Sequence, residues 1–240
     1  MGQPRIVIIG AGPAGVRAAE TLVAAGMRPV MIDEGLRDGG QVYRRQPDGF
    51  KRSEQTLYGT EAGRAHALHA AFDAIRSRID YRPRTLAWNI WDNDLYVVSD
   101  GVSTVLPWDA LILCTGAVDR IMPVPGWELA GTYSLGAAQI ALKAQACAIG
   151  RRVVFMGTGP LLYLVAKQYV AAGAGVAAVL DTSPFGLRIR AAPGLLKRPA
   201  VLAKGLALMF ALNRAGVRIE TGVTPGQCRW RHRLPRRFAS

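Results

Sequence analysis

The residues with the clearest chemical potential lie close to the amino terminus, where a β-branched run leads into closely spaced glycines. In a G-x-G-x-x-G turn the first glycine allows a tight bend, the second lets the backbone approach a pyrophosphate, and the third lets the next helix pack closely. The free N–H groups and the dipole at that helix start attract anions. The sequence therefore predicts a phosphate-binding turn made by Gly10, Gly12, Pro13, Ala14 and Gly15.

A carboxylate follows at the spacing expected for a ribose contact. The apolar stretch 29–32 ends in Asp33 and Glu34, and Asp33 lies 21 residues after Gly12. A carboxylate at this place can accept hydrogen bonds from both hydroxyls of an adenosine ribose. The glycine motif alone often marks only a turn. Here the motif is followed by a helix, a second strand and an acid at the expected spacings, and this combination favours nucleotide binding.

The hydrophobic pattern indicates which elements position these residues. The unbroken apolar run 6–9 is typical of a parallel strand buried on both faces, and residues 16–25 favour a helix. Period-two alternation over 85–106, with Asp-Asn and Asp-Gly turns, predicts three short antiparallel strands. The chain then returns to a buried strand at 110–114. The predicted fold class is α/β, with an antiparallel meander attached to a parallel sheet.

A helix over residues 60–78 is predicted from apolar residues at helical spacing. His66 and His69 are three residues apart on it and could pair on a metal. Because no carboxylate or cysteine stands nearby at ligand spacing, a solvated helix face is the favoured interpretation. No metal site is predicted.

A second unit repeats the pattern about 150 residues later. The strand-like run 152–156 meets Gly157 and Gly159, and Asp181 follows 22 residues after Gly159. Leu162 replaces the third glycine and would hold the helix off the strand. We expect a second dinucleotide-type fold and leave its binding of NAD(H) open. If it binds, Asp181 disfavours the 2′-phosphate of NADP.

Composition narrows the class of protein. Half of the 240 residues are hydrophobic, so a folded chain is expected, and no apolar run reaches the ~18–20 residues of a membrane span. Three widely spaced cysteines argue against a disulfide framework and suit the cytoplasm. Much of the net charge of +13 comes from the residues after Asp181, where Glu220 is the only acid. With no nucleic-acid module beside it, this charge predicts a solvated or aberrant tail, with no nucleic-acid partner.

Together these stretches resemble the two-dinucleotide-domain flavoproteins of the pyridine nucleotide-disulfide oxidoreductase class. More narrowly, they are similar to the FAD-containing subunits of opine oxidase, hydroxyproline or proline dehydrogenase, and hydrogen cyanide synthase. The narrower resemblance is carried by residues 39–44, 125–131, 135–139 and 157–163.

The resemblance implies a role for each matching residue. Gly10, Gly12 and Ala14 would take the FAD pyrophosphate, and Asp33 the adenosine ribose, with Glu34 beside it. Gly40 and Gln41 would border the flavin. Ala87 would contact adenine through its backbone, and Thr115 and Gly116 would close the pocket.

The sequence departs from the family pattern in two ways. No two cysteines lie within thirty residues of each other, which excludes the usual thiol–disulfide exchange and leaves hydride transfer at the flavin. The Gly-Asp pair with which the family completes its FAD domain is also absent. We therefore expect a member shortened at its carboxyl end, with an FAD-binding part over residues 1–120, an NAD(P)-type part over 121–224, and a basic tail over 225–240.

The function expected from the sequence is that of an FAD-dependent amine or amino-acid dehydrogenase subunit. It would work with a second oxidase or dehydrogenase subunit on a small-molecule amine or amino acid. No side chain stands out as a general base. Two alternatives remain open: an NAD(P)H-dependent flavin reductase without a redox disulfide, and a non-catalytic nucleotide-binding fragment.

Overall fold

A computed structural model describes residues 4–50 and 52–226, and they form two compact units. The first unit contains the residues up to Val118 together with Gln139–Cys147. The second contains Asp119–Ala138 and the residues from Ala148 onward. The division falls inside one helix, α4 (Leu135–Ala144), and the expected tail lies largely outside the described residues.

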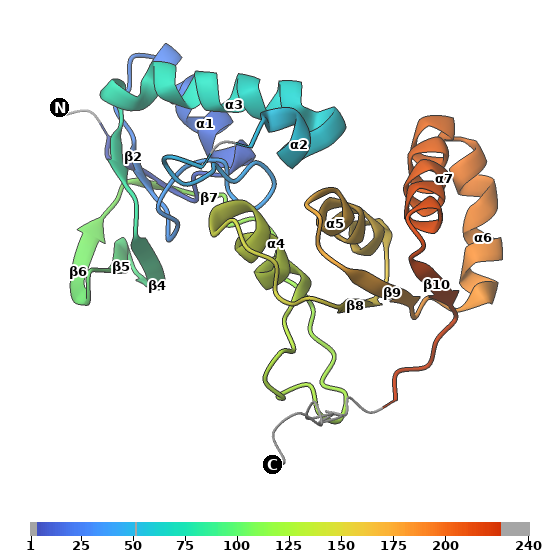
Figure 1. The fold of residues 1–240 in the computed structure, drawn as a ribbon. Coiled ribbons are helices and arrows are strands. Elements are labelled where there is room, and N and C mark those ends of the chain that lie inside the picture. Colours follow the sequence, from blue (N-terminus) through green and yellow to red (C-terminus); the bar gives the residue numbers. More distant parts are fainter. Residues whose placement is uncertain (1–3, 51, 227–240) are drawn as a thin grey trace. The chain divides into compact units, whose positions relative to one another are not determined.

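A four-stranded parallel sheet forms the centre of the first unit (Figure 1). Its strands, in the order β3-β2-β1-β7, are β3 (Asp80–Arg82), β2 (Val30–Ile32), β1 (Ile6–Ile9) and β7 (Ala110–Leu113). Because β1 lies between β2 and β7, the carboxyl ends of all three strands meet at one edge. That edge is where ligands bind in open α/β sheets.

The apolar run of β1 is explained by burial on both faces of the sheet. Ile8 packs in a core cluster with residues of α1 (Pro13–Ala24) and α3 (Ala62–Ile75). Val7 and Ile9 belong to a second cluster that also contains Leu95 of the meander. A strand covered on both sides needs no polar face, so the prediction from the unbroken run is confirmed.

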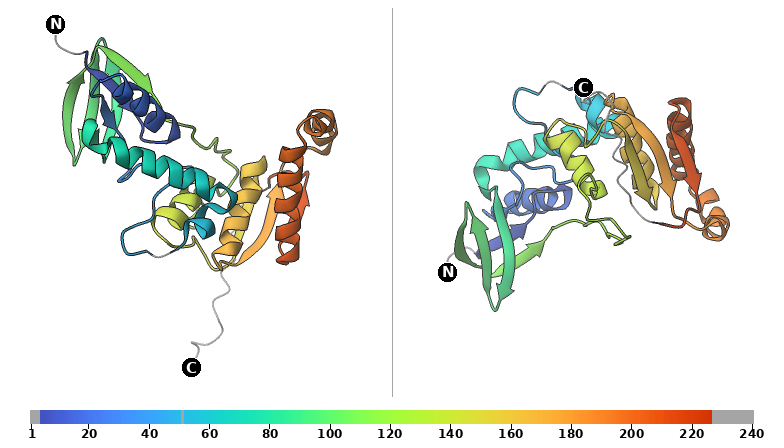
Figure 2. Two further views of the ribbon diagram at one scale, coloured as in Figure 1. Left: turned by 90° about the horizontal axis from the view of Figure 1, so that it is seen from above. Right: turned by 60° about the horizontal axis from the view of Figure 1, so that its bottom comes forward.

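The meander is a separate antiparallel sheet of three strands, on the other side of the parallel sheet from α3 (Figure 2). It consists of β4 (Thr85–Trp91), β5 (Asp94–Ser99) and β6 (Val102–Pro107). Asp92 and Asp100 adopt positive φ in the two connections, as tight hairpin turns require. The predicted α/β class with an attached meander is confirmed.

A helical region connects β2 to β3. It consists of α2 (Glu54–Tyr58), α3 and two short 3₁₀ turns, η1 (Gly59–Glu61) and η2 (Arg76–Arg78). The expectation that both histidines lie on a solvated face is wrong for one of them. His66 is exposed, but His69 is only 8% exposed, because it lies on the same helix face as buried Ala65 and Phe72.

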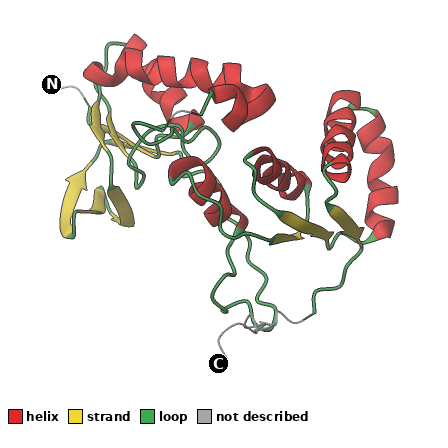
Figure 3. Cartoon of the chain, in the orientation of Figure 1, coloured by secondary structure: helices red, strands yellow, loops and turns green. Residues whose placement is uncertain are grey.

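The second unit contains a parallel sheet of three strands in the order β10-β9-β8 (Figure 3). Its strands are β8 (Val153–Gly157), β9 (Val176–Asp181) and β10 (Arg218–Thr221), and its further helices are α5 (Pro160–Ala171), α6 (Phe185–Leu196) and α7 (Pro199–Arg214). Lys197 and Arg198 separate α6 from α7. Pro199 opens α7, where its missing N–H costs no hydrogen bond.

Membrane-spanning helices and metal clusters are both absent from the described residues. None of the helices in these residues combines the length and apolar character needed to cross a bilayer. Within the same residues, no three or more His, Cys, Asp or Glu side chains gather as a metal site.

Candidate dinucleotide-binding site

The turn after β1 can be made only by glycine. Gly10 has φ of +106°, and its N–H donates to the Ile32 carbonyl at 2.8 Å. A Cβ at Gly10 would overlap the carbonyl oxygen of Cys114, and a Cβ at Gly15 would overlap that of Gly10. The first and third glycines of the motif therefore let the turn approach β7 and let α1 pack on the turn.

The start of α1 offers backbone donors to a ligand. The helix begins at Pro13, and its N-cap residue, Gly12, makes no side-chain hydrogen bond. The first intrahelical bond runs from Val16 N–H to Gly12 O at 3.0 Å. The N–H groups of Ala14 and Gly15 precede it, in the turn where an α-helix has no acceptor of its own. Such groups form an anion site, as the sequence predicts.

Asp33 lies directly beside this turn. Its Oδ2 accepts a hydrogen bond from Ala11 N–H at 2.6 Å, and its Oδ1 accepts one from Gly35 N–H at 2.6 Å. Each carboxylate oxygen has a further lone pair for a ligand hydroxyl. The carboxylate thus points toward the phosphate turn, while the neighbouring Glu34 is exposed.

The meander is joined to the same place. Thr85 N–H donates to the Asp33 carbonyl at 2.9 Å, and Arg84 N–H donates to the Gly35 carbonyl at 3.1 Å. Ala87 follows on β4, pairs with Val97 and packs against the core cluster beneath the sheet. Ala87, the residue expected to contact adenine through its backbone, therefore lies on a strand that begins beside Asp33.

A second glycine loop lies on the phosphate turn. Gly39 N–H donates to the Ala11 carbonyl at 2.9 Å. Gly40 has φ of +57°, and a Cβ there would stand 2.8 Å from the Gly12 Cα. The two loops meet backbone to backbone with no side chain between them, and the following residue, Gln41, is exposed.

The last predicted segment of the site follows β7. Cys114 N–H donates to the Ile9 carbonyl at 2.8 Å, which extends the pairing of β7 with β1. Thr115 and Gly116 come next and are exposed. The structure thus gathers the turn, Asp33, the Gly39–Gly40 loop and Thr115–Gly116 at one edge of the sheet.

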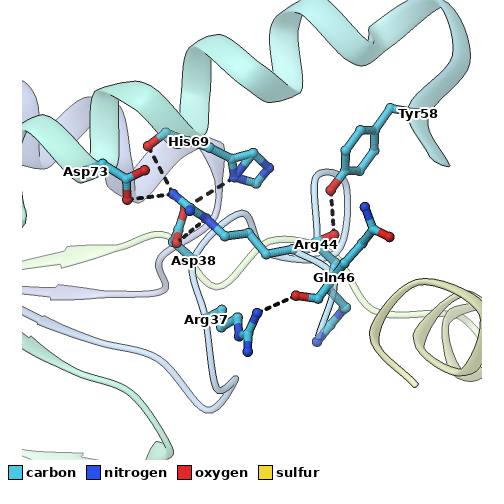
Figure 4. Close-up of polar contacts among 8 residues, drawn as sticks. Arg37, Asp38, Arg44, Gln46, Tyr58, His69 and Asp73 are labelled. Carbon is cyan, nitrogen blue, oxygen red and sulfur yellow. Dashed lines mark hydrogen bonds and ion pairs between the residues drawn. The ribbon is translucent and has the colours of Figure 1, made fainter. Parts of the chain in front are cut away.

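Sequence reasoning missed a cluster of charged and polar side chains behind the Gly39–Gly40 loop (Figure 4). Asp38 and His69 are buried, at 4% and 8% exposed, and Arg45 and Asp73 lie against them. The Arg45 Nε lies 2.8 Å from Asp38 Oδ1. Burial raises the pKa of Asp38, although the Arg45 charge opposes the rise, and burial lowers the pKa of His69, reinforced by the same guanidinium.

In the second unit, Gly157 and Gly159 form the corresponding turn. Both have positive φ, and Gly159 is the N-cap residue of α5 without a side-chain hydrogen bond. Leu162, which replaces the third glycine, is 2% exposed and packs within van der Waals reach of Gly157. Gly159 thus leaves the start of its helix without a side-chain cap, as Gly12 does, but its φ of +92° differs from the −76° of Gly12.

Asp181 differs from Asp33 in its surroundings. It is 2% exposed, and its carboxylate accepts hydrogen bonds from the Tyr163 hydroxyl at 2.6 Å and from Ser183 N–H at 2.8 Å. The Thr158 and Ser183 hydroxyls lie 2.6 Å apart and join the turn to the segment after β9. Asp181 is thus buried and hydrogen-bonded within the fold, whereas Asp33 is partly exposed.

Residues 4–229 match the pyridine nucleotide-disulphide oxidoreductase family. The chain belongs to this family. An opine oxidase subunit of Rhizobium meliloti is 41% identical over 221 residues, which cover 87% of this chain and 41% of that protein. Hydrogen cyanide synthase subunit HcnB of Pseudomonas protegens is 33% identical, covering 90% of this chain and 46% of its own. The chain thus spans less than half the length of these relatives.

Solved structures show the same fold at lower identity. The L-proline dehydrogenase from P. horikoshii has a TM-score of 0.60 at 18% identity, over 75% of this chain and 35% of that one. The HOCl-induced flavoprotein disulfide reductase RclA from Escherichia coli has a TM-score of 0.61 at 20% identity, over 93% and 50%. These likenesses show that the chain shares the fold of the two solved structures.

The first unit fits FAD by its own geometry. A diphosphate needs free backbone donors and a surface without side chains, which the start of α1 and the contact of Gly12 with Gly40 provide. A ribose needs an acceptor at the end of β2, which Asp33 provides.

Proposed function

We propose that this chain is the FAD-binding portion of an amine or amino-acid dehydrogenase subunit that exchanges electrons with a second, substrate-oxidising subunit. The observation that carries the proposal is the meeting of Gly12, Gly40 and Asp33 at one sheet edge. The similar proteins named above, from an opine oxidase and a hydrogen cyanide synthase, are themselves subunits by name.

The proposal assigns binding roles along this edge. The N–H groups at Gly12 and Ala14 would take the diphosphate behind the Gly10 turn, and Asp33 would accept from the ribose. The flavin side would be bordered by Gly40 and Gln41, and Thr115 and Gly116 would close the pocket. When bound, FAD supplies hydride chemistry, while these residues hold and orient it.

The described cysteines support hydride transfer over thiol exchange. Cys114 and Cys147 are both free thiols, and they stand on separate segments of the chain. Burial raises the pKa of the Cys114 thiol, which keeps it protonated and unreactive near neutral pH.

The second unit favours a partner subunit over NADH as the source of electrons. Asp181 is 2% exposed and accepts hydrogen bonds from Tyr163 and Ser183, so this acid is less accessible to a nicotinamide nucleotide than the partly exposed Asp33 is to FAD. The proposal therefore gives this unit a structural role, and NADH-driven flavin reduction becomes the competing outcome of the test.

The test is anaerobic reduction of the flavin. The chain is reconstituted with FAD, and its visible absorbance is followed after adding NADH, or an opine or amino acid together with the partner subunit. Bleaching only with the substrate and partner supports the proposal. Bleaching by NADH alone identifies a flavin reductase, and a protein that takes up no FAD overturns the proposal.

A further inference from the structure

The cluster behind the second glycine loop consists of Asp38, Arg45, His69 and Asp73, and is called the loop clamp below. We propose that Arg45 is a positioning residue: through the loop clamp it holds Gly39 and Gly40 against the phosphate turn and so sets how tightly the first unit binds FAD. The FAD part of this inference rests on the proposed function.

Arg45 joins the two ends of the loop. Asp38 immediately precedes Gly39, and its Oδ1 lies 2.8 Å from the Arg45 Nε. One ion pair therefore closes the segment 38–45 into a compact loop. The Asp38 side chain is 5% exposed and that of Arg45 is 27% exposed, so water screens this pair far less than a surface pair.

The same guanidinium fastens the closed loop to α3. One of its terminal nitrogens, Nη2, donates to Asp73 Oδ1 at 2.8 Å and to the His69 carbonyl at 3.0 Å. Both acceptors belong to α3, whose apolar face is part of the core. The loop is thereby tied to a rigid element and not only to itself.

His69 links α3 to the glycines by packing against Gly39. Its Cε1 would lie 3.1 Å from a Cβ built on Gly39, so the ring stands directly behind that residue. Gly39 N–H in turn donates to the Ala11 carbonyl in the phosphate turn. A displacement of α3 or of His69 would therefore be transmitted to the turn through one residue.

The loop has few apolar contacts that could replace the clamp. Val42 is 56% exposed, and Gln41 is exposed as well. Tyr43 is the loop residue that packs against the core clusters.

Two further polar contacts reach backbone carbonyls of the loop. The Tyr58 hydroxyl donates to Arg44 O at 2.7 Å, and Lys143 Nζ donates to Val42 O at 3.3 Å. Polar contacts, with Arg45 at their centre, therefore fix the loop.

The test compares Arg45→Met and Arg45→Lys with a control, Arg218→Gln. Arg218 lies on β10 in the second unit and forms an ion pair with Glu220, and its side chain is 76% exposed. Hydrogen exchange of the peptide covering residues 39–46 is measured without FAD, and the dissociation constant for FAD is measured by flavin fluorescence.

For Arg45→Met we expect amide exchange in this peptide to rise about tenfold and FAD affinity to fall about tenfold, as for the loss of a charge-assisted hydrogen bond. Arg45→Lys keeps the charge but not the forked geometry, and should fall between wild type and Arg45→Met. The control should stay within about twofold of wild type in both measurements. If Arg45→Met also stays within that range, the inference is overturned.

Two further outcomes are possible: Arg45→Met could fail to fold, or the wild-type chain could fail to bind FAD. If Arg45→Met shows no cooperative unfolding transition, Asp73→Asn replaces it, because this variant keeps the Asp38–Arg45 pair and weakens only the tie to α3. Unchanged exchange and FAD affinity in Asp73→Asn would then overturn the inference. If the wild-type chain binds no FAD, the proposed function fails, and the exchange of residues 39–46 alone decides whether Arg45 holds the loop.

Discussion

Gly40 lies so close to Gly12 that a Cβ on Gly40 would stand 2.8 Å from the Gly12 Cα, a separation that real Cβ atoms do not show. Gly40 also has φ of +57°. The residue is therefore restricted twice, by its backbone conformation and by the neighbouring loop, whereas most glycines in turns meet only the first restriction.

Gly40→Ala should consequently weaken FAD binding more than its backbone strain alone explains. The matched control is Gly49→Ala, since Gly49 also has positive φ but a Cβ there would meet no atom within 4 Å. Both variants should lose about 1 kcal/mol of stability from the left-handed conformation. Only Gly40→Ala should lose FAD affinity, by at least about tenfold in a fluorescence titration. Equal effects of the two variants would contradict the role of the contact.

Asp33→Asn tests the acid at the end of β2. The carboxylate accepts from two backbone N–H groups, of Ala11 and Gly35, and an amide can satisfy only one of them with oxygen. We expect FAD affinity to fall by about 5- to 150-fold, corresponding to about 1–3 kcal/mol. Asp100→Asn, at an exposed hairpin turn, is the control and should bind FAD as the wild type does. Unchanged FAD affinity in Asp33→Asn would contradict the proposed contact of Asp33 with the ribose.

Lys143 gives a pH-dependent prediction. It is 4% exposed, and burial lowers its pKa from 10.5 to about 8. Below pH 8 it is charged in both the folded and the unfolded chain, so folding bears the full cost of burying the charge. As the pH rises through 8 to 10.5 the folded state loses the proton first, and the cost disappears.

Lys143→Met should therefore stabilise the first unit at pH 7, by about 1–3 kcal/mol, and this gain should shrink as the pH approaches 10.5. The measurement is urea unfolding of the variant and the wild type at several pH values. Lys167→Met, at an exposed position of α5, is the control for the same substitution outside a buried site. A gain that stays constant up to pH 10.5 would show that Lys143 is not the titrating group.

Tyr163→Phe examines whether Asp181 has a structural role. The variant removes a hydroxyl that donates to a buried carboxylate at 2.6 Å, and should destabilise the second unit by about 1–3 kcal/mol. Tyr133→Phe, at a residue 53% exposed, should cost little. FAD affinity should not change in either variant. Unchanged thermal unfolding of Tyr163→Phe would argue that Asp181 does not depend on this hydrogen bond.

The features predicted well from the sequence are those encoded locally. The glycine turn and Asp33 could be placed because strand, turn, helix and strand follow one another at fixed spacings, and each glycine has a steric reason that the structure reproduces at Gly10 and Gly15. The meander could be predicted because alternation and turn residues agreed.

The loop clamp could not be predicted in the same way. Arg45 and Asp73 are 28 residues apart, and their contact depends on how α3 packs on α1, which spacing does not determine. One local signal does point to part of it: His69 follows Ala65 by four residues and precedes Phe72 by three, so it shares the buried face of the helix. Its burial follows from the same periodicity that predicted the helix.

The central claim is that the backbone at Gly12 binds the FAD diphosphate. The most direct test is to titrate the wild type and Gly12→Val with FAD and to measure bound flavin by its visible absorbance. We expect the wild type to bind FAD stoichiometrically and the valine variant to stay nearly colourless, because its branched side chain would occupy the open side of the turn and crowd Gly40. Equal flavin content in a correctly folded Gly12→Val would contradict this placement of the diphosphate.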